Sequence, residues 1–564
     1  MASIVYDIRT NKDGLTAELY KTDVVDILIS GHTISNTIGV ENIYSFSDEI
    51  FYNGNYKIKL IDLQSNILWH DNVDVSCIID GWKFTINTNA SGATNNTQFT
   101  LPTVIGSNYN STINWGDGTT TPLTGATDTR KTHIYSSPGI YQIKISGLFG
   151  GFGFFHGGDC LKMITIDSYI PSSVNLINVV GGFMGCYNLT TIPVDLFRYC
   201  TGITSMHQTF FHCSSLTTIP TDLFKYNTLV TDFGYMFLEC TSLTSIPNNL
   251  FDYNILVTSF INTFNRCNSL TSIPNNLFDY NILVTSFSGT FNECTALTSI
   301  PNNLFDYNTG VTTFSGVFRG CLALTSISNN IFRYNTNVTD FSDTFNSCNS
   351  LTSIPNNLFD YNTGVTTFSG VFRGCLALAS IPNNLFDYNI LVTSFINTFS
   401  YCTSLSAIPV DLFRYNTLVT TFGYTFSYCT SLSTIPVDLF RYNTGVTTFI
   451  NIFGSCQLLT TIPEDLFYYN NNVIDYSDVF MNCHSFTLPT RMFNISNLGI
   501  VTNWDGFMNR STIGISPTGI IQKIWSTTDS PAGDVAYIVE PTKLDAFQSC
   551  VGITNYATIP TSWI

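Results

Sequence analysis

Residues 242–268 read SLTSIPNNLFDYNILVTSFINTFNRCN, and this unit of 27 residues recurs along more than half of the chain. A proline marks the same position in ten copies: Pro193, Pro220, Pro247, Pro274, Pro301, Pro355, Pro382, Pro409, Pro436 and Pro463. A cysteine recurs in step in twelve: Cys186, Cys213, Cys240, Cys267, Cys294, Cys321, Cys348, Cys375, Cys402, Cys429, Cys456 and Cys483. A fixed period of about 20 to 50 residues indicates stacked coils that each contact only their neighbours. We therefore predict a solenoid.

Each unit predicts two short strands and two tight turns. The strands are expected at Leu270–Ile273 and Val284–Phe287, and both are interpreted as alternating apolar and polar residues, as in a strand with one buried face. A phenylalanine such as Phe278 follows the first strand and Phe291 follows the second, and both are expected to point inward. The proline lacks the N–H of a strand ladder, so it should end the first strand and open a short helical turn.

An asparagine follows each proline position by seven residues. The column is Asn227, Asn254, Asn281, Asn308, Asn335, Asn362, Asn389, Asn416, Asn443 and Asn470. Asparagine tolerates the left-handed backbone conformation that ends a helical turn, and its amide can bond nearby backbone. We predict that this column forms the corner of the coil.

The repeat resembles the leucine-rich repeats of BspA-like proteins on bacterial surfaces and in some phage. The likeness is carried by F-x-x-C-x-x-L-T-x-I-P segments, such as Phe291-Asn292-Glu293-Cys294 followed by Leu297 and Ile300-Pro301. The resemblance implies a solenoid and an adhesive role, and it implies no catalytic residues. The asparagine signature of ordinary leucine-rich repeats, L-x-x-L-x-L-x-x-N, is not cleanly present, so the sequence does not predict a horseshoe curvature.

Composition excludes several partners. Charged residues make up 11% of the chain and the net charge is −17. Binding to nucleic acid, or to an anionic membrane surface, needs many Lys and Arg, so we predict neither partner. The start of the chain, Met1–Asp7, has no basic segment followed by an apolar run, and no run of about 18 apolar residues occurs anywhere. We therefore expect no signal peptide and no membrane span, and display on a surface by assembly.

The chain has sixteen cysteines, and the twelve in the repeat column are predicted to be small buried side chains rather than disulfides or metal ligands. Stacked cysteines have parallel Cβ vectors, and four others, Cys77, Cys160, Cys200 and Cys550, are left unpaired. With seven His and no CxxC or HxxxH spacing, we predict no metal. GLFGGFG at 147–153 lacks the Lys-Ser/Thr of a phosphate loop, so we predict no cofactor.

The chain before the repeats predicts two small β domains. Residues 1–82 alternate strand-like runs with turn signals, including a hairpin at Asn53-Gly54, and we predict an Ig-like sandwich that attaches the protein to an assembly. Residues 83–147 carry Trp115-Gly116-Asp117-Gly118 and the stretch HIYSSPGIY at 133–141. These motifs resemble the PKD domain, an Ig-like sandwich of extracellular and virion proteins, which implies a spacer or a weak glycan-contact module. Asp117-Gly118 should make a tight hairpin turn.

Three further segments complete the predicted organisation. Residues 148–185 form a joint and an N-terminal capping coil, and residues 186–510 form the solenoid. Arg510 is expected in the Cys position of the last regular coil. Residues 511–564 hold a degenerate coil, an insertion and a C-terminal cap.

One column in the repeat is our candidate for ligand binding. A tyrosine follows each proline position by six residues, from Tyr199 to Tyr469. The candidates are Tyr226, Tyr253, Tyr280, Tyr307, Tyr334, Tyr361, Tyr388, Tyr415 and Tyr442. Their rings either stack on one another to shield the corner or form a stripe that stacks on sugar rings.

The residue before each tyrosine is charged and changes sign. The column is Arg198, Lys225, Asp252, Asp279, Asp306, Arg333, Asp360, Asp387, Arg414 and Arg441, and we expect it to be exposed. It either marks a solvated face or matches a charged partner.

An enzymatic role is not predicted. His156, His207, His212 and His484 are scattered without matched Ser or Asp partners. An enzyme built on a solenoid would have to place its carboxylates in the late insertion, near Asp529, Asp534 and Glu540.

These features together predict a mainly β, non-enzymatic virion protein of a bacteriophage, fibre-like or decorating the capsid or tail. Residues 1–82 would bind other virion or surface-assembly proteins, the solenoid would bind a host surface glycan or protein, and the protein would be oligomeric in that assembly. The alternatives are a bacterial cell-surface adhesin and a purely architectural coat protein.

Overall fold

The computed structural model describes residues 81–487, 489, 492–494 and 500–514, together with the backbone of six strands within residues 1–80. Those strands are β1 (Ser3–Thr10), β2 (Leu15–Lys21), β3 (Ile27–Ile34), β4 (Asn42–Glu49), β5 (Gly54–Ile61) and β6 (Ile67–Val75). They form two antiparallel sheets, a pair β1-β4 and a four-stranded sheet β3-β2-β5-β6. The described backbone of residues 1–80 therefore consists of β-strands.

The predicted hairpin at Asn53-Gly54 is wrong. The strands before and after it lie in different sheets, since β4 pairs with β1 while β5 pairs with β2 and β6. An Asn-Gly step favours a turn but does not fix which strands pair, and β4 and β5 each pair with other strands.

The second domain is built on a five-stranded antiparallel sheet in the order β10-β9-β12-β7-β13. Its strands are β7 (Trp82–Asn87), β9 (Tyr109–Asn114), β10 (Thr120–Leu123), β12 (Ile140–Phe149) and β13 (Met163–Ile166), and β8 (Gln98–Thr100) pairs separately with β11 (Thr132–Ile134). The fifth strand, β13, comes from the stretch predicted as a capping coil and pairs with β7. The sheet thus continues directly into the repeats.

The hairpin predicted around Asp117-Gly118 is confirmed, because β9 and β10 pair with Thr120 opposite Asn114. Trp115 is fully buried at this turn, and its ring stacks on His133 at 4.8 Å between centroids. Burial alone would raise the pKa of Asp117, but hydrogen bonds with Thr119 and His133 outweigh it and lower the pKa to about 2. The side chains of Trp115 and Asp117 are therefore engaged by neighbours within the domain.

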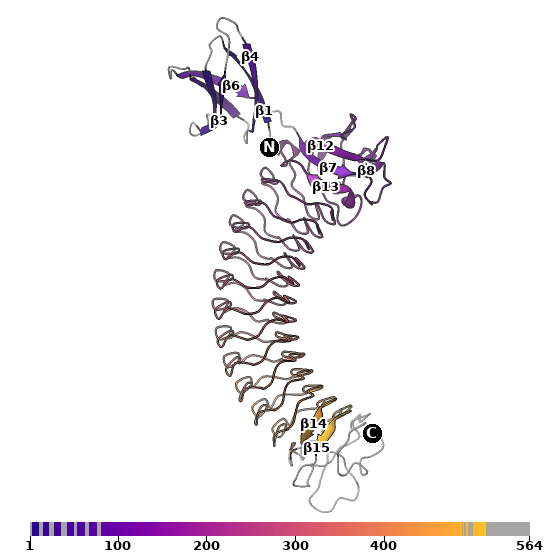
Figure 1. The fold of residues 1–564 in the computed structure, drawn as a ribbon, viewed down its shortest axis with the longest axis vertical. Helices are drawn as coiled ribbons and strands as arrows, with labels where there is room; N and C mark the ends of the chain where they lie inside the picture. Colours follow the sequence, from indigo (N-terminus) through magenta and orange to yellow (C-terminus); the bar gives the residue numbers. More distant parts are fainter. Residues whose placement is uncertain are drawn as a thin grey trace, which may run out of the picture.

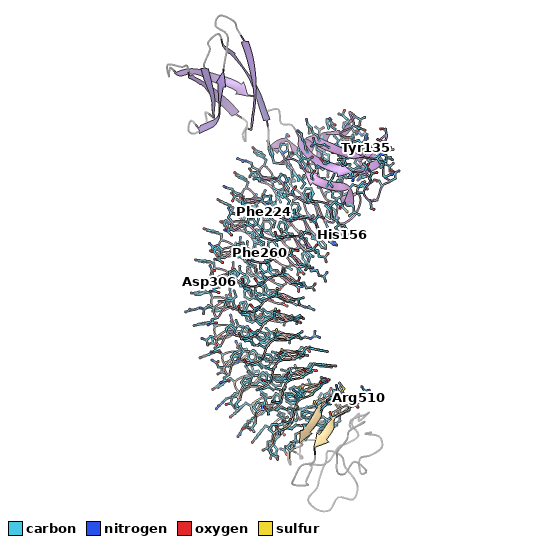
Figure 2. All side chains as sticks on the ribbon, viewed as in Figure 1. Tyr135, His156, Phe224, Phe260, Asp306 and Arg510 are labelled. Atoms are coloured by element: carbon cyan, nitrogen blue, oxygen red, sulfur yellow. The ribbon has the colours of Figure 1, made fainter. Side chains whose placement is uncertain are left out.

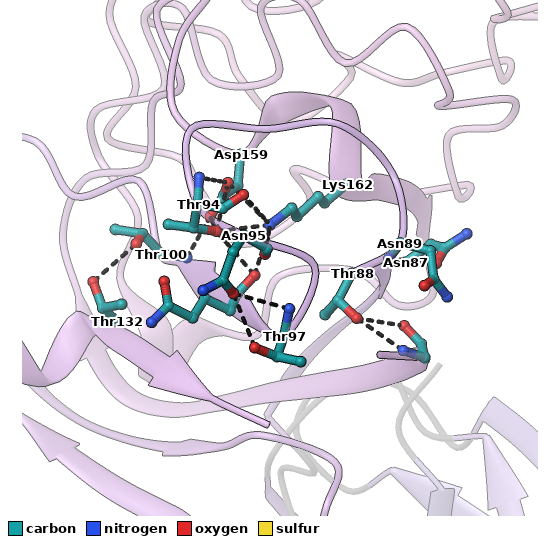
Figure 3. Close-up of polar contacts among 12 residues, drawn as sticks. Asn87, Thr88, Asn89, Thr94, Asn95, Thr97, Thr100, Thr132, Asp159 and Lys162 are labelled. Carbon is teal, nitrogen blue, oxygen red and sulfur yellow. Dashed lines mark hydrogen bonds and ion pairs between the residues drawn. The ribbon is translucent and has the colours of Figure 1, made fainter. Parts of the chain in front are cut away.

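A buried ion pair anchors the segment before β13 to the loop before β8. Lys162, in the short 3₁₀ helix η2 (Cys160–Lys162), lies 3.4 Å from Asp159, and both side chains are fully buried. The Lys162 ammonium donates to the carbonyls of Thr94, Asn95 and Gln98, while Asp159 accepts the backbone N–H of Thr94 and of Thr100. Figure 3 shows these contacts converging on the loop before β8.

The repeats form a row of stacked coils between residues 176 and 511, which we call the coil stack (Figure 1). Successive coils are in parallel register: isolated bridges link Ser259 to Ser286, Ser286 to Thr313, and so on at intervals of 27 residues. The predicted strand Val284–Phe287 thus pairs with its neighbours at one residue per coil. In the other predicted strand Leu270 and Ile273 are buried while Thr271 and Ser272 are both exposed, so that segment does not alternate strictly.

Three columns of aromatic rings fill the interior of the coil stack. Phe260, Phe264 and Phe278 of one coil are fully buried, and each stacks on its equivalent in the next coil, as predicted for the inward phenylalanines. Tyr476 and Trp504 continue the first column at its C-terminal end. Leu, Ile, Val and Cys fill the space between the rings.

The asparagine column bonds nearby backbone through its amides, as predicted, but its predicted left-handed conformation is wrong. None of its members has a positive φ, and all are buried. Asn281 donates from Nδ2 to the carbonyls of Phe251 (3.2 Å) and Asn254 (3.0 Å) in the preceding coil, and its equivalents repeat both bonds. The positive φ values fall elsewhere, at positions such as Asn262 and Arg266. The amide therefore ties coils together instead of ending a helical turn.

The coil stack bends into an arc (Figure 1), with Asp306 on its convex edge and His156 and Arg510 on its concave side (Figure 2). On the concave edge, backbone N–H groups at alternate residues donate to the next coil, as Asn262 does to Ser288, Phe264 to Thr290 and Arg266 to Asn292. On the convex edge of the coils from Pro220 to Asn443 the backbone bonds are local turns, and side chains equivalent to Asn281 bridge the coils instead.

The spacing of the rings follows this difference. The Phe264 and Phe291 centroids lie 5.7 Å apart, whereas the Phe278 and Phe305 centroids, nearer the convex edge, lie 6.2 Å apart. Direct backbone bonding holds the coils closer on one edge than side-chain bridging does on the other, and the coil stack curves accordingly.

The fold has almost no helix. Within the described residues the helices are η2 and two other 3₁₀ turns, η1 (Thr129–Lys131) and η3 (Ser172–Val174), so the helical turns expected after each proline are runs of tight turns instead. No helix in this part of the chain has the length and apolarity needed to span a bilayer.

The last described coil is one residue longer than the repeat, which corrects the predicted place of Arg510. Asp475 pairs with Asn503, and Ser511 occupies the Cys position, donating to the carbonyl of Phe480 as Cys483 does to Phe453. Arg510 therefore takes the position before it. β14 (His484–Thr487) and β15 (Thr512–Gly514) pair in parallel here. The predicted insertion and cap beyond residue 514 lie outside the described residues.

Candidate functional site: the tyrosine stripe

The candidate tyrosines project from the convex edge because of the two residues beside them in each coil. In the turn Asn276–Asn281, Phe278 is buried in the core and Asn281 is buried against the preceding coil, which leaves Tyr280 between them pointing outward. The same arrangement recurs in the coils from Tyr226 to Tyr469. We call the nine candidates from Tyr226 to Tyr442 the tyrosine stripe.

Eight members of the tyrosine stripe, Tyr253 to Tyr442, are exposed over 38% to 56% of their surface, and Tyr226 is half-buried. The described residues show no ring contact between consecutive members, whereas the phenylalanine columns stack throughout. The rings are thus separate from one another and open to solvent along one edge.

The charged column determines what lies against each ring. Arg198 places its guanidinium 4.9 Å from the ring of Tyr226 in the next coil, and Arg333 lies 5.3 Å from Tyr361 in the same way. Lys225 over Tyr253, Arg414 over Tyr442 and Arg441 over Tyr469 repeat this geometry. A cation over the face of a tyrosine is attracted by the ring quadrupole.

The acidic members of the column behave differently. Asp252, Asp279 and Asp306 follow one another on consecutive coils and are half-buried rather than fully exposed. Burial raises the pKa of the Asp279 carboxyl, and the carboxylates of Asp252 and Asp306 raise it further. Like charges one coil apart thus repel each other on this part of the edge.

The structure also brings together side chains that the sequence left apart. On the concave side, Nε2 of His156 lies 3.2 Å from Nδ1 of His212 and 2.8 Å from the hydroxyl of Tyr187. Nδ1 of His212 lies 3.2 Å from Glu239, which also pairs with Arg266 at 2.7 Å. His156 and His212 thus have no Ser or Asp partner among these contacts, in line with the sequence analysis, but they do have ring and glutamate partners that it did not reveal.

This concave cluster is a surface network of rings and ion pairs. Burial lowers the pKa of His212, Glu239 opposes that effect, and His156 lowers the pKa further. His207 pairs with Asp232 separately, at 3.1 Å. The sequence signal that could have found the cluster is the period itself, because His212, Glu239, Arg266 and Glu293 share one position in consecutive coils.

No group of three or more His, Cys, Asp or Glu in the described part of the chain has the geometry of a metal site. Asp529, Asp534 and Glu540, the carboxylates considered for an enzyme, lie outside the described residues. The described cysteines are free thiols, and all are buried.

Comparison with known proteins identifies one family. The model of the family described as "Mycoplasma protein of unknown function, DUF285" matches three overlapping segments, residues 183–302, 285–411 and 393–512, which together span more than half of the chain. No curated protein matches the chain.

Two solved structures show similarity to the chain. A leucine-rich cell surface protein from Faecalibacterium prausnitzii A2-165 shares 19% identity over 70% of this chain and 88% of its own, with a TM-score of 0.28. TLR13, crystallised with ssRNA13, shares 11% identity over 52% of this chain and 49% of its own, with a TM-score of 0.18.

Proposed function

The chain belongs to the family described as Mycoplasma protein of unknown function, DUF285, and we propose that it is a non-enzymatic adhesion protein displayed on a cell surface. In this proposal the coil stack is a leucine-rich-repeat solenoid of the BspA-like kind. Its tyrosine stripe contacts a glycan or protein on the opposing surface. The two β domains before it are proposed to be Ig-like, the second PKD-like, with residues 1–82 attaching the protein to its assembly.

The observation that carries the proposal is the exposure of the tyrosine stripe. Its eight exposed rings face solvent in register, while the packing of the coils is completed without them by the phenylalanine columns and the buried asparagines. Aromatic side chains with a polar tip are enriched where proteins meet partners. A row of equivalent sites also suits adhesion, because many weak contacts act together.

The test is binding of the full chain to glycan arrays and to whole cells. We expect a variant with Tyr253, Tyr280, Tyr307 and Tyr334 all changed to Ser to bind at least about ten-fold more weakly, with an unchanged thermal midpoint. The control changes Thr258, Thr285, Thr312 and Thr339, which are exposed on a flank of the same coils, to Ser. If the wild-type chain binds no cell and no glycan, the adhesive role fails and an architectural role replaces it.

The bacteriophage particle predicted in the sequence analysis is the other surface on which the same role could be played. Gold-labelled antibody to the chain, applied to cells and to purified particles from the same culture, separates the two settings. Label confined to particles would move the proposal from the cell surface to the virion.

A further inference from the structure

The chain's own cations already occupy most of the tyrosine stripe. Tyr226, Tyr253, Tyr361 and Tyr442 each have an arginine or lysine of the preceding coil over the ring, and Tyr334 and Tyr415 have the arginine that precedes them in sequence. The distances from the cation to the ring centroid lie between 4.9 and 5.7 Å. Most rings of the tyrosine stripe therefore have a guanidinium or ammonium group over the ring face.

Three rings have no such cation among the described residues: Tyr280, Tyr307 and Tyr388. They are also the most exposed members of the tyrosine stripe, at 55%, 56% and 55%, whereas the other exposed members lie between 38% and 48%. At these rings the charged column supplies aspartate on both the same and the preceding coil. The cation is thus replaced by a carboxylate, and the ring face is left open.

Tyr280 and Tyr307 are neighbours, so they form a double opening. We define the open window as these two rings with the three carboxylates of Asp252, Asp279 and Asp306. Oδ1 of Asp279 is inaccessible to solvent and has no hydrogen-bond partner in the described structure. Negative charge is concentrated in the open window. The nearest basic members of the charged column lie over other rings: Lys225 over Tyr253, and Arg333 over Tyr334 and Tyr361.

We propose that the open window binds an extended basic segment of a partner protein, whose alternate arginine or lysine side chains lie over Tyr280 and Tyr307 and pair with the aspartates. This inference rests on the proposed adhesive function and names the partner class for one part of the tyrosine stripe. The chain itself displays the ligand chemistry, since Arg333 over Tyr361 is the contact that a partner's arginine would make over Tyr307.

The spacing of the coils fits such a segment. Neighbouring coils are 6.2 Å apart at the Phe278 and Phe305 rings, two residues before the tyrosines. Side chains on one face of an extended strand recur every two residues, about 6.6 to 6.8 Å apart. Ile282 and Leu283, exposed at 57% and 48% beside the window, offer apolar surface for the aliphatic stems of those side chains.

Charge complementarity favours this occupant over a neutral sugar. The chain carries a net charge of −17, so a basic segment is attracted before contact while a neutral glycan is not. Two stacked cations are each worth about two- to five-fold in affinity at an exposed site. We therefore expect weak binding by one window, strengthened where a partner is displayed in many copies.

The test uses the full chain and a fluorescein-labelled peptide, Gly-Ser-Arg-Ser-Arg-Ser-Gly, in fluorescence anisotropy. The neutral control is the same peptide with citrulline in place of arginine, which keeps the shape and removes the charge. We expect the arginine peptide to bind and the citrulline peptide to bind at least about ten-fold more weakly. Equal binding of the two peptides would overturn the proposal.

Two variants test the window itself. Tyr280→Ala with Tyr307→Ala should weaken the arginine peptide about ten-fold, whereas Tyr415→Ala with Tyr442→Ala, on rings that Arg414 already covers, should change it less than two-fold. Asp279→Arg should place a guanidinium of the chain itself over Tyr280 and Tyr307, as Arg333 lies over Tyr334 and Tyr361, and should abolish binding of the arginine peptide. Its charge-matched control is Ser272→Arg with Ser299→Arg, on an exposed flank of the same coils.

The outcomes separate this inference from the proposed function. If the arginine peptide binds Asp279→Arg as tightly as it binds the wild type, the open window is not its site. The same conclusion follows if Asp279→Arg and the control Ser272→Arg with Ser299→Arg weaken its binding equally. If cells or neutral glycans bind the wild type and lose binding with Tyr280→Ala and Tyr307→Ala while the peptide does not bind, the adhesive role stands and the partner is a glycan. If neither binds, both proposals fail.

Discussion

One asparagine per coil supplies the side-chain hydrogen bonds that link neighbouring coils on the convex edge. Asn281 donates two hydrogen bonds to carbonyls of the preceding coil, and its own Oδ1 has no partner among the described atoms. Buried carbonyls that lose their donors cost free energy, because no water replaces the bond. The position therefore tolerates neither a smaller side chain nor an ionised one.

Asn281→Ala should lower the free energy of unfolding by about 2 to 4 kcal/mol, because it leaves the carbonyls of Phe251 and Asn254 without this donor. Urea unfolding followed by circular dichroism measures the effect. Asn275→Ala, at an exposed position in the same coil, is the control and should change the free energy by less than about 0.5 kcal/mol. Equal effects of the two substitutions would show that the amide bonds do not support the coil.

The cysteine column gives the coil stack a defined dependence on pH. Each thiol in the column from Cys213 on donates to the carbonyl of a phenylalanine in the preceding coil, as Cys294 does to Phe264 at 3.2 Å. Burial raises the pKa of the Cys294 thiol to about 12, and the pKa values of its equivalents are raised in the same direction. The folded chain therefore keeps these protons where an unfolded chain loses them.

The free energy of unfolding should fall as the pH rises above about 8.5, the ordinary thiol pKa, towards about 12. In that window the unfolded state releases protons that the folded state holds, at about 1.4 kcal/mol per thiol per pH unit. Urea unfolding between pH 7 and pH 10 measures the slope. In a variant with Cys267, Cys294 and Cys321 all changed to Ala, the slope of the free energy of unfolding against pH should be smaller by the contribution of three thiols. An unchanged slope would show that these thiols do not cause the pH dependence.

At the scale of elements, the ion pair of Lys162 and Asp159 anchors the segment before β13 to the loop before β8. Both groups are fully buried, and the Lys162 ammonium and the Asp159 carboxylate each bond the loop at residues 94–100. A buried pair of this kind contributes little over apolar packing, but breaking it leaves a charge that nothing balances.

Lys162→Met should therefore destabilise the second domain by about 3 to 5 kcal/mol, since Asp159 is left buried and charged. Fluorescence of the buried Trp82 and Trp115 during urea unfolding reports on this domain. Replacing both partners, Lys162→Met with Asp159→Leu, should recover part of the loss. A single substitution that costs less than about 1 kcal/mol would show that the loop does not need the pair.

For the whole molecule, the coil is the unit of construction. Residues 299–327 and 353–381 differ only at Thr325 and Ala379, and each coil bonds the coils directly before and after it. Whole coils should thus be removable without disturbing the rest, provided that the register of the concave ladder and of the asparagines is kept.

Deleting residues 326–379 removes two whole coils and joins Thr325 to Ser380, which restores the sequence of the repeat. We expect a folded, shorter coil stack with an unchanged circular dichroism spectrum per residue and a smaller maximum dimension by small-angle X-ray scattering. Deleting residues 326–366 instead breaks the register and should give an unfolded or aggregated chain. If both deletions fold equally well, register is not what holds the coils together.

The sequence by itself determined the period, the inward phenylalanines, the buried cysteines and the hairpin at Asp117-Gly118, because each depends on a side-chain pattern that repeats or acts locally. Only the tertiary structure decided the curvature, the role of Asn281, the meeting of His156 with His212 and the attachment of β13 to the sheet. It also decided which rings of the tyrosine stripe are covered. These features depend on spacings between coils, where backbone bonds on one edge and longer side-chain bridges on the other set distances that no single repeat encodes.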